Sequence, residues 1–211
     1  MRIVTAQELE SWLTSGEVLE QDGRGPKVIR LRDNQLFKVF RPRRRLWLAR
    51  LLPQAERFKR NAEQLLANGI TAPCVNECLW LDKTRAISGC TYTPLPGCSL
   101  EQIYRRSRSE FSLLVPQFAE FIQQLHQRGI YFRSLHLGNV LLLPSGELGL
   151  IDFLDLQFKS APLSSGLIKR NLAHLQGYLR RNQVDDFPWT ALQTAYAQAA
   201  HNSTKKPTDE A

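Results

Sequence analysis

Short apolar runs separated by turn residues fill the first part of the chain, as is typical of β-strands. Three such runs predict strands near residues 18–20, 27–31 and 35–40. Two more strands are expected at about 74–81 and 86–93, on the same grounds of apolar runs between turn residues. The first part of the chain is therefore expected to be rich in strands.

Helical spacing of apolar residues interrupts these strands twice. A short helix is predicted over 7–15, with Thr5 able to cap its start and Gly16 to end it. A long helix is predicted over 46–67, where apolar residues recur every third or fourth position until an Asn-Gly pair follows.

The second part of the chain predicts mainly helices around one hairpin. In chain order we expect a helix at 99–107, a helix at 110–128, an irregular stretch at 129–139, a β-hairpin made of 140–143 and 148–151, and mostly helical structure over 163–200. Strands that come first and helices that come after indicate an α+β fold, because a parallel α/β sheet would alternate the two.

One segment is the best candidate for a boundary inside the chain. Residues 94–97 read Pro-Leu-Pro-Gly, and proline and glycine both interrupt regular structure. We therefore expect a strand-rich N-lobe over 1–97 and a helical C-lobe over 98–201, followed by a frayed polar tail over 202–211.

Composition narrows the class of protein and the kind of partner. The 211 residues carry a formal charge of +8, which favours an anionic partner. The densest basic run is 41–45, with four arginines around one proline, and Arg105, Arg106 and Arg108 form a second. No apolar run is long enough to span a bilayer, and the first residues lack a secretory signal, so a cytoplasmic protein is expected. The four cysteines have no paired spacing, and neither a disulfide framework nor a zinc site is expected.

The segment most suggestive of chemistry is Tyr-Phe-Arg-Ser-Leu-His-Leu-Gly-Asn at 131–139, which the predicted hairpin follows. Arg133, Leu135 and Asn139 stand at the spacings of a protein-kinase catalytic loop, and Asp152 closes the hairpin where kinases carry a metal-binding aspartate. The chain therefore resembles the protein-kinase-like superfamily from about residue 17 to 180. The resemblance implies two lobes, here a small β-rich N-lobe and a reduced helical C-lobe.

The same resemblance implies binding of ATP and Mg²⁺. Lys38, on the third predicted strand, corresponds to the lysine that pairs with the nucleotide phosphates, and Asn139 and Asp152 correspond to the magnesium ligands. Glu56 or Glu63 would orient Lys38, since both lie on one face of the predicted helix; Glu56 is preferred. The candidates for a phosphate-covering loop are Gly23 and Gly25, although the usual run of three glycines is missing.

The loop departs from the kinase pattern at its centre. Ser134 occupies the place of the aspartate that accepts the substrate proton, and a serine hydroxyl is not a base near neutral pH. His136 and Asp155 are conceivable substitutes for that base, and Arg133 completes the candidate catalytic set. Phosphoryl transfer depends mainly on positioning and charge stabilisation, so the loss of the aspartate need not abolish activity.

Several segments resemble bacterial "toluene tolerance" proteins, which are relatives of the lipopolysaccharide core heptose and Kdo kinases. These segments are Gly-Pro-Lys-Val at 25–28, Arg57-Phe58 with Asn61, Gly69-Ile70, and the loop at 131–139. That likeness implies phosphorylation of a sugar in the lipopolysaccharide inner core, with an anionic glycolipid as partner and peripheral contact with the inner face of the inner membrane. Two alternatives remain: a catalytically impaired pseudokinase or scaffold in envelope biogenesis, and an atypical kinase linked to tRNA modification. A nucleic-acid partner is not expected, because the aromatic residues are scattered rather than interleaved with the basic ones.

Overall fold

The computed structural model describes residues 1–205, and the side chains of 1–202. The chain divides into two compact units, Met1–Pro96 and Gly97–Ala211, which we call unit 1 and unit 2. Sheets and helices both contribute, and the fold is α+β.

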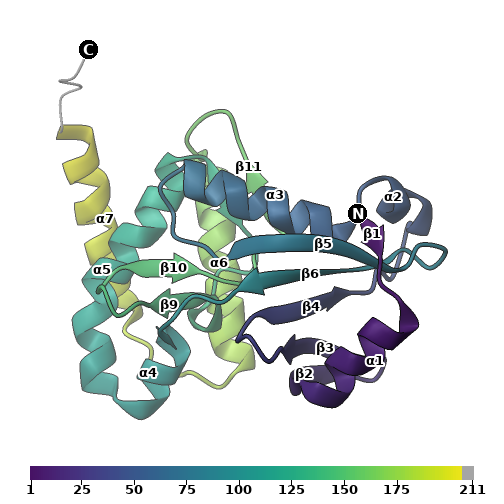
Figure 1. Ribbon diagram of the computed structural model, residues 1–211. Helices are drawn as coiled ribbons and strands as arrows, with labels where there is room; N and C mark the ends of the chain where they lie inside the picture. The colour runs from purple at the N-terminus through teal and green to yellow at the C-terminus, as the bar shows by residue number, and fades with distance from the viewer. Residues whose placement is uncertain (206–211) are drawn as a thin grey trace. The chain divides into compact units, whose positions relative to one another are not determined.

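Unit 1 is built on a six-stranded mixed sheet of order β1-β5-β6-β4-β3-β2 (Figure 1). Its neighbouring strands are antiparallel except for the parallel pair of β1 and β5. The strands are β1 (Arg2–Ile3), β2 (Glu17–Asp22), β3 (Gly25–Arg30), β4 (Leu36–Phe40), β5 (Cys74–Asp82) and β6 (Ile87–Thr93). Five of the six were expected from the sequence. The sixth, β1, is only two residues long and is too short to show a periodic pattern.

The central strand β4 divides its side chains between two helices. Phe37 faces helix α1 (Ala6–Ser15), where its ring lies 4.7 Å from that of Trp12. Phe40, which points to the opposite face, lies 5.5 Å from Phe58 on helix α3 (Gln54–Ala67). Side chains of a strand alternate between faces, so Lys38 shares the α3 face with Phe40. Figure 1 shows α1 and α3 on opposite sides of the sheet.

The expectation of a single helix over 46–67 is wrong. The segment forms two helices, α2 (Leu46–Leu51) and α3 (Gln54–Ala67), with Leu52 and Pro53 between them. Proline has no backbone N–H to donate and disfavours helical dihedrals at the residue before it, which breaks the helix at Leu52. The other expected helix of unit 1 is confirmed, since the Thr5 side chain accepts a hydrogen bond from the Glu8 N–H and Gly16 ends α1.

Unit 2 contains most of the helices. They are α4 (Leu100–Arg106), α5 (Arg108–Gln127), α6 (Ser165–Arg181) and α7 (Trp189–Lys205). A three-stranded sheet joins β7 (Cys98–Ser99), β9 (Val140–Leu142) and β10 (Leu148–Leu150), and a two-stranded sheet pairs β8 (Ile130–Phe132) with β11 (Leu156–Phe158). Ser99 and Gln102 form a reciprocal capping box that starts α4.

Two expectations for unit 2 need correction. The stretch 129–139 is not irregular throughout, because it contains β8 and a short 3-10 helix, Leu137–Asn139. The supposed tail begins inside α7, which continues to Lys205, while residues 206–211 lie outside the described residues. Within residues 1–205, no helix is long and apolar enough to cross a membrane.

Candidate functional site

The loop between β8 and β9 holds most of the candidate catalytic residues in a fixed conformation. The Asn139 N–H donates to the carbonyl of His136, and the Asn139 side-chain amide donates to the carbonyl of Ser134, both at 3.0 Å. Asn139 is buried, with 8% of its surface exposed. Its NH₂ group is therefore held by the loop, which leaves the amide oxygen as the group that can bind something else.

The hairpin of β9 and β10 connects the two candidate metal ligands. The Ile151 N–H donates to the Asn139 carbonyl at 3.0 Å, so Asp152 follows directly on a backbone contact with Asn139. Asp152 is exposed and has a φ of 51°, in the left-handed region that residues with a Cβ seldom adopt. Such backbone strain is typical of functional sites, where the surrounding structure maintains it.

The donor set suits a hard cation. An aspartate carboxylate and an asparagine amide oxygen are ligands that Mg²⁺ accepts, usually together with water and phosphate oxygens. Within the described residues, no three His, Cys, Asp or Glu side chains gather as a metal cluster. A site made of Asn139 and Asp152 therefore fits a cation that shares its coordination with a phosphate-bearing substrate, rather than a cation enclosed by protein alone.

Ser134 donates a hydrogen bond to Oδ2 of Asp155, at an Oγ–Oδ2 distance of 2.7 Å. Arg133 also approaches this oxygen, with its Nε at 3.4 Å. The other carboxylate oxygen, Oδ1, is buried and has no hydrogen-bond partner among the described residues. The loop thus couples the serine to a carboxylate that lies 21 residues away in the sequence.

His136 is enclosed by aromatic and acidic side chains. Its ring stacks on that of Tyr178, with centroids 4.0 Å apart, and its Nδ1 accepts the Gly138 N–H at 3.2 Å. Burial lowers the pKa of His136 below its usual range, although Glu101 and Asp152 act in the opposite direction. His136 is therefore neutral near pH 7, and one of its nitrogens is already used within the loop.

Buried polar residues outside the loop fix its starting point. Asn171 on α6 donates to the Phe132 carbonyl at the end of β8, at 2.6 Å, and its Oδ1 lies 2.9 Å from Nε2 of His126. Nδ1 of His126 lies 2.7 Å from the hydroxyl of Tyr196. His126 lies in the last turn of α5 and is only 2% exposed. No local signal reveals this role, because its partners lie 45 and 70 residues away.

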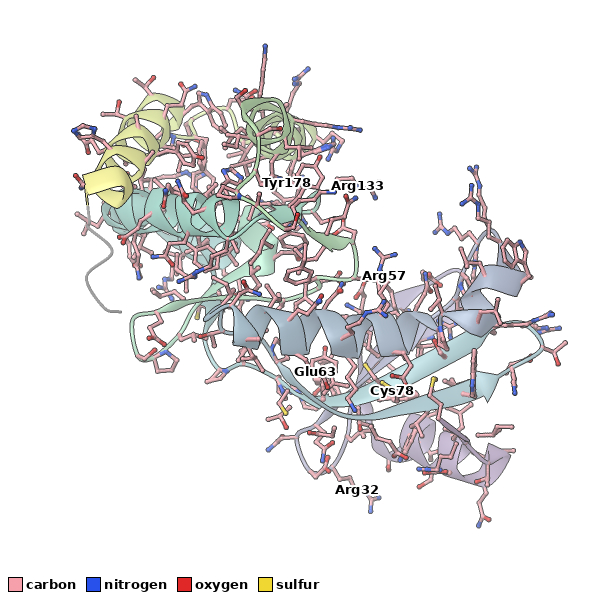
Figure 2. The ribbon with its side chains drawn as sticks, turned by 90° about the horizontal axis from the view of Figure 1, so that it is seen from above. Arg32, Arg57, Glu63, Cys78, Arg133 and Tyr178 are labelled. Atoms are coloured by element: carbon pink, nitrogen blue, oxygen red, sulfur yellow. The ribbon has the colours of Figure 1, made fainter. Side chains whose placement is uncertain are left out.

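Cationic side chains surround one further histidine of unit 2. Burial lowers the pKa of His174, and the positive charges of Arg170, Arg133 and Arg181 lower it further. Arg133 and Tyr178, labelled in Figure 2, lie on the same side of unit 2. This cluster places positive charge beside the loop that carries Ser134, where an anionic ligand would be favoured.

In unit 1, Lys38 lies on a buried strand with its ammonium group over an aromatic ring. It is 6% exposed, and its Nζ is 5.3 Å from the ring centroid of Phe58. Lys38 stands opposite Cys90 on β6, which in turn stands opposite Cys78 on β5. Burial raises the pKa of the Cys78 thiol to about 12 and also raises that of Cys90, so both are unreactive packing residues.

The remaining candidates of unit 1 lie on α3 and in the first hairpin. Glu56 is exposed on α3, and its charge acts on Cys78, as does that of Glu63, which is labelled in Figure 2. Gly23 lies in the turn between β2 and β3, and Gly25, with a φ of 108°, begins β3. The Arg24 N–H in this turn donates to the Asp22 side chain at 2.8 Å and is therefore occupied within the hairpin.

No protein-family model matches the sequence, and no curated protein is similar to it at a significant level. Unit 2 brings together Ser134, Asn139 and Asp152 with the histidine at 136, and adds the carboxylate of Asp155.

Proposed function

We propose that the protein is a small kinase-like phosphotransferase that uses ATP and Mg²⁺. The observation that carries the proposal is the backbone contact between the two ends of the hairpin, Ile151 N–H to Asn139 carbonyl, because Asp152 directly follows Ile151. The order of these residues in the chain, together with Lys38 on a preceding strand, is that of the protein-kinase-like superfamily. The proposal includes the two-lobed arrangement of that superfamily.

Each of three residues has a separate task in this proposal. Asn139 and Asp152 would hold Mg²⁺, which neutralises the charge of the outer phosphates when it is bound. Lys38 would pair with the inner phosphates of the nucleotide. Because Lys38 is buried, water screens the attraction between its ammonium group and the phosphates only weakly. Glu56 remains the preferred partner for orienting Lys38.

Ser134 and Asp155 would together replace the missing aspartate. The Ser134 hydroxyl donates to Asp155, so the lone pairs of its oxygen can accept the hydroxyl proton of a substrate. As the new bond from the substrate oxygen to phosphorus forms and the bond to the leaving ADP breaks, the substrate proton passes to Ser134 Oγ and the serine proton passes to Asp155. His136 would then line the site rather than act as the base, because its Nδ1 is held by Gly138.

The acceptor in this proposal is anionic. Arg133, Arg170 and Arg181 place positive charge around His174, next to the Ser134 loop. A sugar of the lipopolysaccharide inner core or a related envelope glycolipid has the required charge, and such a substrate would be reached at the inner face of the inner membrane. A kinase linked to tRNA modification is not favoured, because kinases of that family normally keep the catalytic aspartate at the position of Ser134.

A nucleotide-binding protein without transfer activity is the second candidate. The specific observation in its favour is that position 134 is a serine, whose hydroxyl already donates to the neighbouring carboxylate of Asp155. In this case the protein would bind nucleotide and serve as a pseudokinase scaffold in envelope biogenesis.

Thermal unfolding with and without nucleotide tests the proposal. ATP with Mg²⁺ should raise the melting temperature, because a ligand that binds only the folded protein stabilises it. Asp152→Ala should abolish the magnesium-dependent part of the shift, and Lys38→Ala should weaken nucleotide binding. Asp185→Ala and Lys83→Ala, at exposed positions of unit 2 and unit 1, serve as matched controls and should shift like the wild type. A wild-type protein that shows no shift at millimolar ATP and Mg²⁺ would refute both candidates.

A further inference from the structure

An unusual concentration of exposed apolar side chains lies on and beside helix α2. Leu46 is 41% exposed, Trp47 64%, Leu51 71% and Leu52 55%. The remaining exposed large apolar side chains of the described residues are spread over the rest of the chain; they are Met1, Ile3, Leu13, Val18, Leu19, Leu66 and Leu113. Four such side chains within seven residues form a patch that a water-soluble surface would not by itself require.

The patch belongs to a segment that is fastened at both ends, which we call the α2 segment (residues 41–52). Arg41 donates to the carbonyl of Pro26 at 2.8 Å, and the Arg50 Nε donates to the carbonyl of Thr84 at 3.0 Å. Figure 1 shows α2 at the edge of unit 1, near the loop that joins β5 to β6 and contains Thr84. These bonds hold the segment in one place on unit 1, so the apolar side chains do not result from fraying.

Helical geometry directs the apolar side chains outward. Trp47 and Leu51 are four residues apart and therefore share a face of α2, and both are more than half exposed. Leu48 and Ala49, on the other face, are partly buried against unit 1. The break at Pro53 separates α2 from α3, so the outward face of α2 is not covered by the longer helix.

Positive charge without acidic partners surrounds this face. Five arginines lie in the α2 segment, and no aspartate or glutamate occurs between Asp33 and Glu56. Arg43, Arg44 and Arg45 are exposed, and no acidic side chain of the described residues pairs with any of them. Several exposed arginines elsewhere do have acidic partners, as Arg30 has in Glu17.

We propose that the α2 segment is a membrane-binding element for an anionic lipid surface. Trp47 and Leu51 would enter the interface between headgroups and acyl chains, where tryptophan and leucine are favoured. The arginines would remain at the level of the lipid phosphates and anionic headgroups. This inference goes beyond the proposed phosphotransferase activity and does not depend on it.

The combination of charge and apolar surface favours lipid over other anionic partners. A nucleic acid would use the arginines at its phosphates, but it would leave most of the exposed leucines without a role. An acidic protein could use both, yet three unpaired arginines in sequence beside an outward apolar face are typical of a helix that lies in a membrane interface. An anionic lipid surface therefore fits the α2 segment better than a nucleic acid or an acidic protein.

Vesicle binding by the full-length protein tests the inference without any nucleotide. Vesicles of phosphatidylcholine with phosphatidylglycerol should bind the wild type, and vesicles of phosphatidylcholine alone should bind it weakly. The Arg43→Gln and Arg44→Gln substitutions should each weaken binding by about fivefold, since one basic residue near an anionic surface contributes roughly that factor. The double variant Trp47→Ala/Leu51→Ala should lose about tenfold or more, because it removes most of the apolar surface that enters the interface.

Matched control variants distinguish binding through the α2 segment from non-specific binding of the protein to vesicles. Leu113→Ala removes a side chain that is 82% exposed on α5, and Arg85→Gln removes an exposed arginine outside the segment; both should bind like the wild type. Far-ultraviolet circular dichroism and thermal unfolding check that every variant folds, and Trp47→Glu provides a second variant at the same position.

Equal binding by wild type and α2 variants, or no binding to anionic vesicles, overturns the inference. Tighter binding to a soluble acidic protein or to RNA than to vesicles, independent of Trp47 and Leu51, also overturns it. Because the assay contains no ATP, vesicle binding can be interpreted even if the protein has no kinase activity.

Discussion

The imidazole of His136 lies flat on the ring of Tyr178, with centroids 4.0 Å apart and planes 5° from parallel. The Tyr178 hydroxyl in turn donates to the carboxylate of Glu101 on α4, a residue 77 positions earlier in the sequence. Burial alone would raise the pKa of Glu101, but hydrogen bonds from Tyr178 and Arg105 outweigh it and lower that pKa. Helices α4 and α6 thus reach the candidate loop through one aromatic stack.

Substitution of Tyr178 should change the titration of His136. In Tyr178→Ala the imidazole becomes accessible to water, so its pKa should rise toward the ordinary value of about 6.5. Tyr178→Phe keeps the stacked ring and loses only the hydroxyl, and should leave the pKa of His136 nearly unchanged. Histidine ring signals followed by NMR against pH give both values. A similar rise in both variants would mean that Glu101, rather than the stack, controls the imidazole.

Ser134 and Asp155 should behave as one unit in phosphoryl transfer. Ser134→Ala and Asp155→Asn should each lower turnover by about 10²-fold, the lower end of what a general base contributes. The double variant should be no slower than either single one, because groups that act in one relay are not additive. Ser134→Asp, which restores the usual kinase residue, should retain turnover. Phosphate incorporation into purified lipopolysaccharide core acceptors measures each rate.

The serine control for this series is Ser145→Ala, in the exposed turn between β9 and β10, and it should be as active as the wild type. Additive losses at Ser134 and Asp155 would contradict the relay. Equal background incorporation of phosphate by the wild type and Asp152→Ala would refute the phosphotransferase function and favour the pseudokinase.

Stability should fall in mildly acidic solution because of His126. Burial lowers the pKa of His126 in the folded protein, so the unfolded chain binds the proton more readily. The stability that the neutral His126 contributes is fully present above the pKa of histidine in the unfolded chain, about 6.5, and is lost as the pH falls below that value. His126→Leu should cost about 1–3 kcal/mol at pH 7.5, since Asn171 and Tyr196 lose their partner. The difference in the free energy of unfolding between His126→Leu and the wild type should be smaller at pH 5.5.

Urea denaturation at the two pH values measures these free energies of unfolding. Leu113→Ala, at an exposed position of α5, is the control and should unfold like the wild type at both pH values. A gap between wild type and His126→Leu that stays constant from pH 7.5 to 5.5 would argue against titration of the buried ring.

Gly97 should tolerate no side chain. Its φ of 133° is one that residues with a Cβ rarely adopt, and an added Cβ would stand 2.3 Å from the carbonyl oxygen of Leu142. Gly146 also has a positive φ, of 84°, but an added Cβ there would have no atom within 4 Å. Gly97→Ala should therefore destabilise by at least about 2 kcal/mol more than Gly146→Ala, which isolates the clash from backbone strain. Comparable melting temperatures for the two variants would refute this account of Gly97.

Local patterns in the sequence predicted the elements but not the contacts between them. The strand that carries Lys38 and the hairpin before Asp152 were identified from apolar runs and turn residues, and both are present in the structure. The helix over 46–67 was predicted as one piece because its apolar spacing continues through Pro53, and a periodic pattern does not weigh a single missing N–H. The exposure of Trp47 could not be predicted either, since spacing alone does not show which face a neighbour covers.

The candidate site was predictable only where it is local in sequence. The spacing of Ser134, Asn139 and Asp152 is visible in the chain, whereas Tyr178 and Asn171 reach the loop from a helix that begins after residue 160. Asp155 was a candidate by proximity, and only the structure shows that its carboxylate accepts the Ser134 hydroxyl. Long-range hydrogen bonds of this kind leave no periodic trace in a single sequence.

The bond from Asn171 to the Phe132 carbonyl sets a lower limit on the size of any working fragment. A chain cut after β11 would still contain every residue from Ser134 to Asp155, yet the end of β8 would have lost its anchor on α6. A cut before α7 would leave His126 without Tyr196 and so loosen Asn171 in turn. Anyone who trims this protein for transplantation into another scaffold should therefore keep the sequence through Tyr196, although no residue after Asp152 belongs to the proposed metal site.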